Sequence, residues 1–179
     1  MTDAPPDTLT LERLESPIGE ALVVTDEAGR LRAFNWRDYE VRMRAWIARR
    51  YPKARLVEDR GPEPVRAGLL AYFKGDAKAL DELPWRASGT VFQLKVWETL
   101  CTIPVGETLS YASLAERIGR PSAVRAVGLA NGANPISLVV PCHRVIGADG
   151  SLTGYGGGLP RKRWLLAHEG ARFKEPLAA

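Results

Sequence analysis

Apolar and polar positions in the first part of the chain predict a small sheet. Residues 18–25 and 31–36 are rich in aliphatic side chains and flank Asp26-Glu27-Ala28-Gly29, which predicts two strands joined by a hairpin turn. Residues 55–58 predict a further short strand. No metal-ligand spacing occurs here, because both histidines lie in the second half of the chain. We therefore expect this part to be a scaffold.

Two segments of the same part have a helical pattern. Residues 39–51 carry apolar side chains at helical spacing, and their arginines are expected to form a solvated face. Residues 64–74 begin with proline and end before Gly75, which are ordinary start and stop signals. Residues 81–85 are the expected linker to the second part of the chain.

The second part begins with a predicted helix over residues 90–101 and a turn over 103–106. A second helix is expected from Ser110, whose hydroxyl can cap it, to Gly119. After the break at Gly119-Arg120-Pro121, Ser122 is expected to cap a third helix that runs toward Asn131. Two short helices around a glycine-containing turn predict a helix-turn-helix, although many such pairs never touch DNA.

The next segment contains the first candidate for chemistry. Residues 136–140 predict a short buried strand and residues 146–150 the turn after it, so Cys142 would lie half-buried at the edge of a core. Such a position beside His143 suits a reactive thiol, but simple packing of a buried cysteine fits the local sequence equally well. Cys101 has no histidine nearby in sequence, and we expect it to be a buried packing residue.

Composition limits the class of protein. With 179 residues, of which 45% are hydrophobic, the chain can bury a substantial core as one or two domains. No apolar run approaches membrane-spanning length, and residues 1–10 do not resemble a signal peptide. Two cysteines make a disulfide scaffold unlikely and favour the reducing cytoplasm.

The net charge of +4 is unevenly distributed. Residues 1–87 contain acidic and basic side chains in equal number, whereas residues 119–163 contain six basic side chains and one acidic side chain, Asp149. The basic residues are Arg120, Arg125, Arg144, Arg161, Lys162 and Arg163. A basic segment beside a candidate reactive loop favours a polyanionic partner, although a solvated basic surface remains the alternative.

Five ordered motifs between Gly89 and Gly170 resemble the O6-alkylguanine-DNA alkyltransferases, also called methylated-DNA–protein-cysteine methyltransferases. The motifs are Arg125-Ala126-Val127-Gly128, Asn134-Pro135, Pro141-Cys142-His143-Arg144-Val145, Gly154-Tyr155-Gly156-Gly157-Gly158 and Trp164-Leu165-Leu166-Ala167-His168-Glu169-Gly170. Their order and spacing are far more specific than any one of them.

The resemblance implies an α+β protein of two domains. Residues 1–82 would form a ribonuclease-H-like α/β scaffold, residues 83–89 a linker, and residues 90–171 a winged helix-turn-helix-like domain that carries the active site. Residues 172–179 would be a tail. No further regulatory or DNA-binding domain is expected, which matches the stand-alone form of the family.

The resemblance also implies a function in direct-reversal DNA repair. An alkyl group would pass irreversibly, once per protein, from O6-alkylguanine, and more weakly from O4-alkylthymine, in duplex DNA to Cys142. The damaged nucleotide would first be flipped out of the duplex through the minor groove, with little sequence specificity. We expect a monomer that can assemble cooperatively on DNA, in the cytoplasm, without membrane association.

The catalytic roles that the resemblance implies fall on five residues. His143 would accept the Cys142 proton through a water molecule, and Glu169 would orient and stabilise the imidazolium. Asn134 would brace the helix-turn-helix against the active-site turn. Tyr111 would hydrogen-bond the flipped guanine. Arg144 is expected to be structural, paired with a carboxylate under the site.

The remaining implied residues bind DNA or shape the base pocket. Arg125 would take the place of the extruded nucleotide, on a helix whose small residues allow close approach to DNA. The other expected DNA contacts are Ser122, Ala123, Ala126 and Ala130. The base pocket is expected to contain Tyr155, Gly156, Gly157, Val145 and Ser137. The zinc-binding cluster of some animal members is missing from the sequence, so we expect no metal, and no cofactor.

Two other classes remain open. A sensor that binds the alkylated base without transferring the group would resemble the alkyltransferase-like proteins, but those lack the cysteine that Cys142 supplies here. A cysteine hydrolase is the weaker alternative, because its histidine normally comes from elsewhere in the chain.

Overall fold

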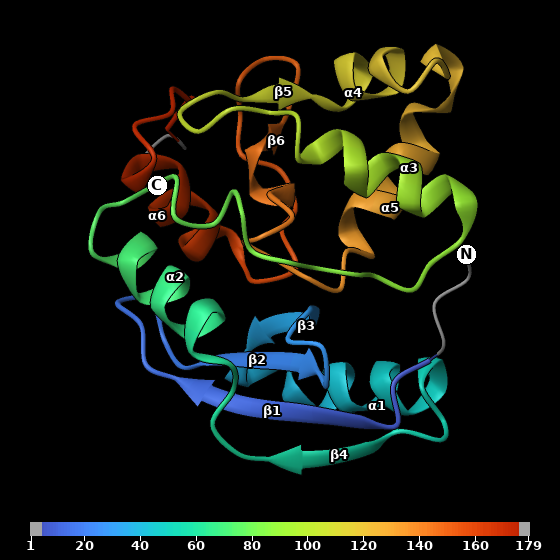
Figure 1. Ribbon diagram of the computed structural model, residues 1–179. Helices are drawn as coiled ribbons and strands as arrows, with labels where there is room; N and C mark the ends of the chain where they lie inside the picture. Colours follow the sequence, from blue (N-terminus) through green and yellow to red (C-terminus); the bar gives the residue numbers. More distant parts are fainter. Residues whose placement is uncertain (1–4, 176–179) are drawn as a thin grey trace. The chain divides into compact units, whose positions relative to one another are not determined.

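The computed structural model describes residues 5–175 and divides the chain into two compact units between Ser88 and Gly89. Figure 1 shows the elements of both units, coloured along the sequence. The first four residues of the expected scaffold and the last four of the expected tail lie outside the described range.

The first unit is built on a four-stranded sheet in the order β3-β2-β1-β4. The strands are β1 (Thr8–Leu14), β2 (Ala21–Asp26), β3 (Leu31–Trp36) and β4 (Arg55–Glu58). Strands β1, β2 and β3 pair antiparallel, whereas β4 pairs parallel with β1. The chain crosses from β3 to β4 through a 3-10 turn (Arg37–Tyr39) and α1 (Glu40–Arg50), as the parallel pairing requires. This topology confirms the expected ribonuclease-H-like α/β fold of the first unit.

One core of this unit lies between the sheet and α1. Met43 and Ile47, one turn apart on α1, pack against a cluster that includes Leu9, Leu22 and Val24. The hairpin turn between β2 and β3 is closed by Asp26, whose carboxylate accepts hydrogen bonds from the backbone N–H groups of residues 28 and 30. The expected hairpin is therefore correct, although its first strand begins three residues later than predicted.

Helix α2 (Glu63–Phe73) packs on the segment that leads out of the unit. A Cβ on Gly68 would lie 2.8 Å from the Leu83 side chain, so the helix and this segment are in close contact. The Leu31 N–H donates to the Pro84 carbonyl at 2.8 Å, and the Leu31 carbonyl accepts from the Arg86 N–H at 2.8 Å. Part of the expected linker is thus hydrogen-bonded to β3 and belongs structurally to the first unit.

Two features of the first unit differ from expectation. Strand β1 was not predicted, although Thr8-Leu9-Thr10-Leu11 alternates as a half-buried strand does. The arginines of α1 were expected to be solvated, which holds for Arg42, Arg49 and Arg50. Arg44 instead forms ion pairs with Glu40 and Glu58, so it belongs to a charge network that also includes Arg13.

The second unit is mainly helical. Its elements are α3 (Val91–Leu100), β5 (Leu109–Ser110), α4 (Tyr111–Arg117), a 3-10 turn (Pro121–Ala123), α5 (Val124–Gly132), a second 3-10 turn (Cys142–Arg144), β6 (Val145–Ile146) and α6 (Leu159–His168). Helices α4 and α5 form the expected helix-turn-helix, and β5 and β6 form a two-stranded parallel sheet. Helices α3, α4 and α5 pack on one another.

Capping explains where these helices begin. Thr90 and Gln93 form a reciprocal capping box at the start of α3, and Ser110 caps α4 through the Ser113 N–H, as predicted. Ser122 does not cap α5: it lies within the 3-10 turn, and the residue before α5 is Ala123. The Trp97 indole donates to the Ala130 carbonyl at 2.8 Å and fixes α3 against α5.

None of the described helices is both long and apolar enough to cross a membrane. Among residues 5–175 there is also no group of three or more acidic, cysteine or histidine side chains that could hold a metal ion.

Candidate active site

Cys142 lies at the start of the second 3-10 turn and is only 4% exposed. The segment before it was expected to be a strand, but residues 136–140 form a tight turn in which the Val140 N–H donates to the Ile136 carbonyl at 3.0 Å. Leu138 has a φ of 74°, a left-handed conformation that an aliphatic residue rarely adopts. The expectation of burial was right and that of a strand was wrong, because an apolar run does not distinguish a buried strand from a buried turn.

Two asparagines, one in the last turn of α5 and one just after it, connect this helix with Cys142 and the turn before it. The Asn134 side chain donates to the Val140 carbonyl at 2.8 Å and accepts from the Ile136 N–H at 3.0 Å. The Asn131 amide donates to the Cys142 carbonyl at 3.5 Å, a long hydrogen bond. The end of the helix-turn-helix is therefore bonded directly to the cysteine turn, in the arrangement expected for Asn134. Sequence reasoning did not single out Asn131 as part of the site.

His143, Arg144 and Glu169 form a buried polar group beneath the cysteine. His143 Nε2 lies 2.9 Å from Glu169 Oε1, and Arg144 donates to both carboxylate oxygens of Glu169 at 2.8 and 3.0 Å. Arg144 also donates to the Ile103 carbonyl at 2.6 Å. Glu169 follows the last residue of α6, so the fold joins residues far apart in sequence, as the spacing of Cys142 and Glu169 required. Arg144 has the structural role expected of it.

The hydrogen bonds fix the state of the imidazole. Glu169 is an acceptor, because its contacts with Arg144 and His143 hold the pKa of its carboxyl at about 2 despite burial. Nε2 of His143 therefore carries the proton and donates it to Glu169. Nδ1 of His143 is buried and has no protein partner, so it is the nitrogen able to accept a proton.

Burial sets the resting charges of the nucleophile and its base. Desolvation raises the pKa of the Cys142 thiol, against the opposing effects of the neighbouring Asn134 and Ser137 side chains and of the positive charge of Lys162. Desolvation also lowers the pKa of His143, although Glu169 opposes this shift. Cysteine and histidine are therefore both neutral at rest.

A cavity of about 250 Å³ opens onto Cys142. It is lined by Tyr111, Gly128, Asn131, Gly132, Cys142, Gly154, Tyr155 and Gly156. Aromatic rings and open glycine surfaces suit a flat heterocycle. Of the residues expected in the base pocket, Tyr155 and Gly156 are present, together with Tyr111.

The other residues expected in the base pocket do not line this cavity. Val145 and Ser137 are almost fully buried in the packing around the cysteine turn, and Gly157 is buried within its loop. Other protein atoms cover the side chains of Val145 and Ser137 and the Cα atom of Gly157. These three residues therefore pack behind the pocket and do not form its wall, which corrects the expectation. Ser137 still influences the site, because its side chain lowers the pKa of the Cys142 thiol against the effect of burial.

Lys162 is a buried residue of the site that sequence reasoning missed. It is 0% exposed, and its ammonium donates to the carbonyls of Val145, Thr153 and Gly154. Lys162 and Arg144 were both counted in the basic segment that was expected to face a polyanion. In the structure, both side chains bind groups inside the protein. The helical spacing of Lys162, Leu165 and Glu169 on α6 was the available signal, because it places them on one face.

The residues expected to contact DNA lie on α5 and on the 3-10 turn before it, and they divide into exposed and buried positions. Arg125, Ala126 and Ser122 are exposed, and Ala123 is partly exposed, so they are available to a partner. Ala130 is 3% exposed and lies against Trp97, so its expected contact with DNA is corrected to core packing.

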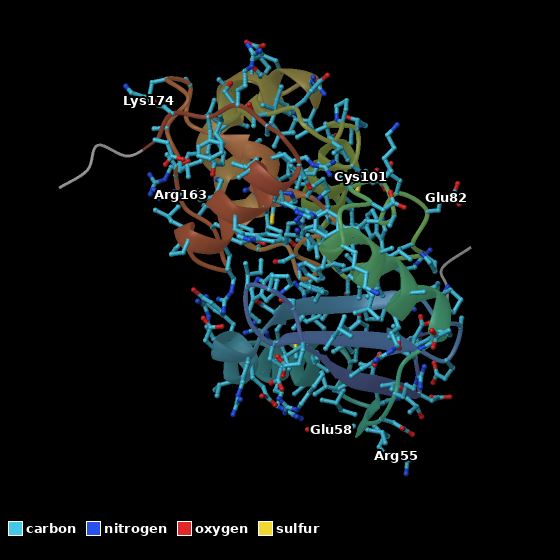
Figure 2. The ribbon with its side chains drawn as sticks, turned by 90° about the vertical axis from the view of Figure 1, so that its left-hand side faces the viewer. Arg55, Glu58, Glu82, Cys101, Arg163 and Lys174 are labelled. Carbon is cyan, nitrogen blue, oxygen red and sulfur yellow. The ribbon has the colours of Figure 1, made fainter. Side chains whose placement is uncertain are left out.

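Cys101 was expected to be buried, but it is exposed at the C-terminus of α3 (labelled in Figure 2). The helix ends one residue earlier than expected, at Leu100, which takes the buried position. Cys142 is thus the cysteine that the fold encloses with a histidine.

A helix-turn-helix bonded to a buried cysteine, which has a His-Glu pair and a cavity beside it, is the arrangement expected of a DNA-binding protein with a thiol nucleophile. Comparison with known proteins narrows this class. Residues 91–171 match the family model described as 6-O-methylguanine DNA methyltransferase, DNA binding domain. The chain is 48% identical over 161 residues to a methylated-DNA–protein-cysteine methyltransferase of Shigella flexneri, which covers 89% of this chain and 94% of that protein.

Solved structures agree over nearly the whole length. The crystal structure of Mycobacterium tuberculosis OGT in complex with DNA has a TM-score of 0.73 and 40% identity, covering 90% of this chain and 92% of that chain. The O6-methylguanine-DNA methyltransferase of Pyrococcus kodakaraensis has a TM-score of 0.69 and 25% identity, covering 91% and 99% of the two chains. The chain therefore belongs to the methylated-DNA–protein-cysteine methyltransferase family, which confirms the resemblance and the two-part fold.

Proposed function

We propose that this protein repairs DNA by direct reversal, transferring an alkyl group from O6-alkylguanine, and more weakly from O4-alkylthymine, in duplex DNA to Cys142. The observation that carries the proposal is the buried Cys142 at the cavity, directly followed by a histidine that is hydrogen-bonded to Glu169. Membership of the family supports the reaction class, and the DNA-bound relative supports DNA as the partner.

The chemistry proceeds in one displacement. His143 Nδ1 takes the Cys142 proton through a water molecule, and Glu169 stabilises the imidazolium by accepting from Nε2. The thiolate attacks the saturated carbon bound to O6, an S–C bond forms, and the C–O bond breaks. Its electron pair passes to the guanine oxygen and ring, and N1 of the base takes up a proton, which balances the one that the His143 imidazolium then returns to solvent. The resulting thioether has no feasible leaving step, so each protein acts once.

Duplex DNA must give up the base before the sulfur can reach it. Exposed Arg125 on α5 occupies the place of the extruded nucleotide, while Ala126, Ala123 and Ser122 allow the helix to enter the minor groove closely. These residues read no base edges, so recognition depends little on sequence. The protein acts as a monomer that can load cooperatively along DNA.

The cavity walls have complementary roles once the base is inside. The Tyr111 hydroxyl hydrogen-bonds the guanine as negative charge develops on the ring, and the loop of Gly154, Tyr155 and Gly156 closes over it. Asn134 holds the cysteine turn in place. Residues 1–82 serve as a scaffold for the repair domain, which comprises residues 90–171. The protein acts in the reducing cytoplasm, because its substrate is DNA and its reaction needs a free thiol.

The test is to follow a labelled methyl group. Duplex DNA that carries one O6-methylguanine with a tritiated methyl is incubated with the protein, and protein, DNA and small-molecule fractions are counted. We expect the label to move to the protein and stay there. Label that remains in DNA bound by the protein would indicate a sensor, and label released as methanol would indicate a hydrolase. Either result would contradict the proposal.

A further inference from the structure

Lys162 is a buried cation that the mechanism above does not use. Its side chain is 0% exposed, and its three hydrogen bonds all go to backbone carbonyls, those of Val145, Thr153 and Gly154. Arg163, the next residue on α6, projects toward solvent (Figure 2). It pairs there with Glu175 at 3.2 Å. Burying an ammonium group is costly unless an anion compensates it.

The carbonyls that hold Lys162 belong to two sides of the site. Val145 directly follows the Cys142–Arg144 turn, whereas Thr153 and Gly154 begin the loop that lines the cavity. One ammonium thus joins the segment that carries the nucleophile to the loop that covers the substrate. Its position is fixed by hydrogen bonds from both directions.

The charges around Lys162 do not balance while the thiol is protonated. Arg144 and Glu169 form an ion pair and cancel each other, and burial keeps His143 neutral. Within residues 5–175 no carboxylate pairs with the Lys162 ammonium. Its coulombic partner is Cys142, and each of the two favours the charged form of the other.

We propose that Lys162 is a positioning residue that clasps the cavity loop to the cysteine segment and serves as the buried counter-charge of the Cys142 thiolate. This inference rests on the proposed function for its biological meaning but concerns the thiol itself. Deprotonation of Cys142 leaves Lys162 and the thiolate as a neutral pair, so the proton that moves to His143 leaves a stabilised anion behind. Burial lowers the pKa of Lys162 to about 8, so the cation is present at neutral pH.

The test measures thiol ionisation without DNA. Cys101→Ser serves as background, because Cys101 is exposed and would react. Alkylation of Cys142 by iodoacetamide is followed against pH by peptide mass in the background protein and in its Lys162→Met and Lys162→Gln variants. Lys95→Met is the matched control, because Lys95 is an exposed lysine on α3.

We expect both Lys162 variants to slow alkylation at pH 7 by about tenfold, and the difference to narrow above pH 8, where Lys162 itself loses its proton. Lys95→Met should leave the rate unchanged. A folded Lys162→Met protein that reacts at pH 7 at the background rate would overturn the proposal. A background rate in Lys162→Gln alone would also overturn it, because hydrogen bonding and not charge would then be what matters.

A second measurement avoids any change at Lys162. The lysine side chain is titrated by carbon-13 NMR in Cys142→Asp, where a carboxylate stands in for the thiolate, and in Cys142→Ser, where the side chain is neutral. Coupling is reciprocal, so the Lys162 midpoint should be about one unit higher in Cys142→Asp than in Cys142→Ser. Equal midpoints would contradict the proposal. Because neither assay contains DNA, failure here leaves methyl transfer untouched, and failure of methyl transfer leaves this result standing.

Discussion

At the scale of single residues, the site depends on buried charges that are held by other side chains. Glu169 is 7% exposed and accepts hydrogen bonds from His143 and Arg144, which keeps it anionic down to a pKa of about 2. The proton relay therefore ends in a fixed negative charge. The identity of these residues was predictable from the motifs, but their bonding was not, because Glu169 reaches the cysteine turn only through the fold.

Replacing Glu169 with Gln should impair both stability and reaction. The folded-state pKa lies below the usual 4.5, so the carboxylate stabilises the protein above pH 4.5, and this contribution is lost as the pH falls toward 2. The difference in unfolding free energy between wild type and variant should thus be about 3 kcal/mol at pH 7 and shrink below pH 4.5, as measured by urea unfolding at several pH values. A difference independent of pH would show that the carboxylate is not the titrating group.

Arg125→Ala should separate flipping from chemistry. Arg125 is exposed on α5 and lies outside the residues that line the cavity, so its loss should slow repair of O6-methylguanine in duplex DNA far more than reaction with free O6-benzylguanine. Single-turnover rates on the two substrates provide the comparison. Equal losses on both would remove the role assigned to this arginine.

At the scale of elements, the nine residues of α5 contact three environments, which are the core, the solvent and the cavity. One side packs Val127 and Ala130 into the core, another exposes Arg125, and its C-terminal turn gives Gly128, Asn131 and Gly132 to the cavity. Its existence followed from the break at Gly119-Arg120-Pro121. Its exact start did not, because the 3-10 turn at residues 121–123 displaced the expected Ser122 cap. The turn at 136–140 escaped prediction for the related reason that apolar character reports burial and not geometry.

Gly132 offers a way to fill the cavity from α5. Its φ is not positive and a Cβ there would have no neighbour within 4 Å, so neither backbone nor packing requires glycine. Gly132→Leu should slow reaction with free O6-benzylguanine by about tenfold or more and affect free O6-methylguanine less, because the added side chain takes room beside the base. Gly132→Ala is the matched control and should react like wild type. Similar rates with Gly132→Leu would mean that this wall does not limit the substituent.

At the scale of the whole molecule, the distribution of charged residues along the sequence predicted the basic surface only in part. The basic excess of residues 119–163 was predictable, but Arg144 and Lys162 are buried and neutralise or position internal groups. Sequence alone could not show this, because a buried and an exposed cation look alike within a run such as Arg161-Lys162-Arg163. The division into two units was easier to predict from the sequence, because each part has its own pattern of apolar positions.

The reduced basic surface predicts a shallow salt dependence of DNA binding. Arg120, Arg125, Arg161 and Arg163 remain at least partly exposed in the basic segment. Four phosphate contacts would give a slope of log affinity against log salt of about −3.6, measurable by fluorescence anisotropy with undamaged duplex. A slope near −6 would show that cations outside this segment also contact phosphate.

The most direct test of the account is the mass of the protein after reaction with excess duplex DNA that contains one O6-methylguanine. We predict a single added methyl group per chain, mapped to Cys142, that does not increase with time or with more DNA. The exposed Cys101 should stay unmodified, and Cys142→Ser should gain nothing. An unmodified protein that still binds the damaged duplex would contradict the central claim that Cys142 is the acceptor.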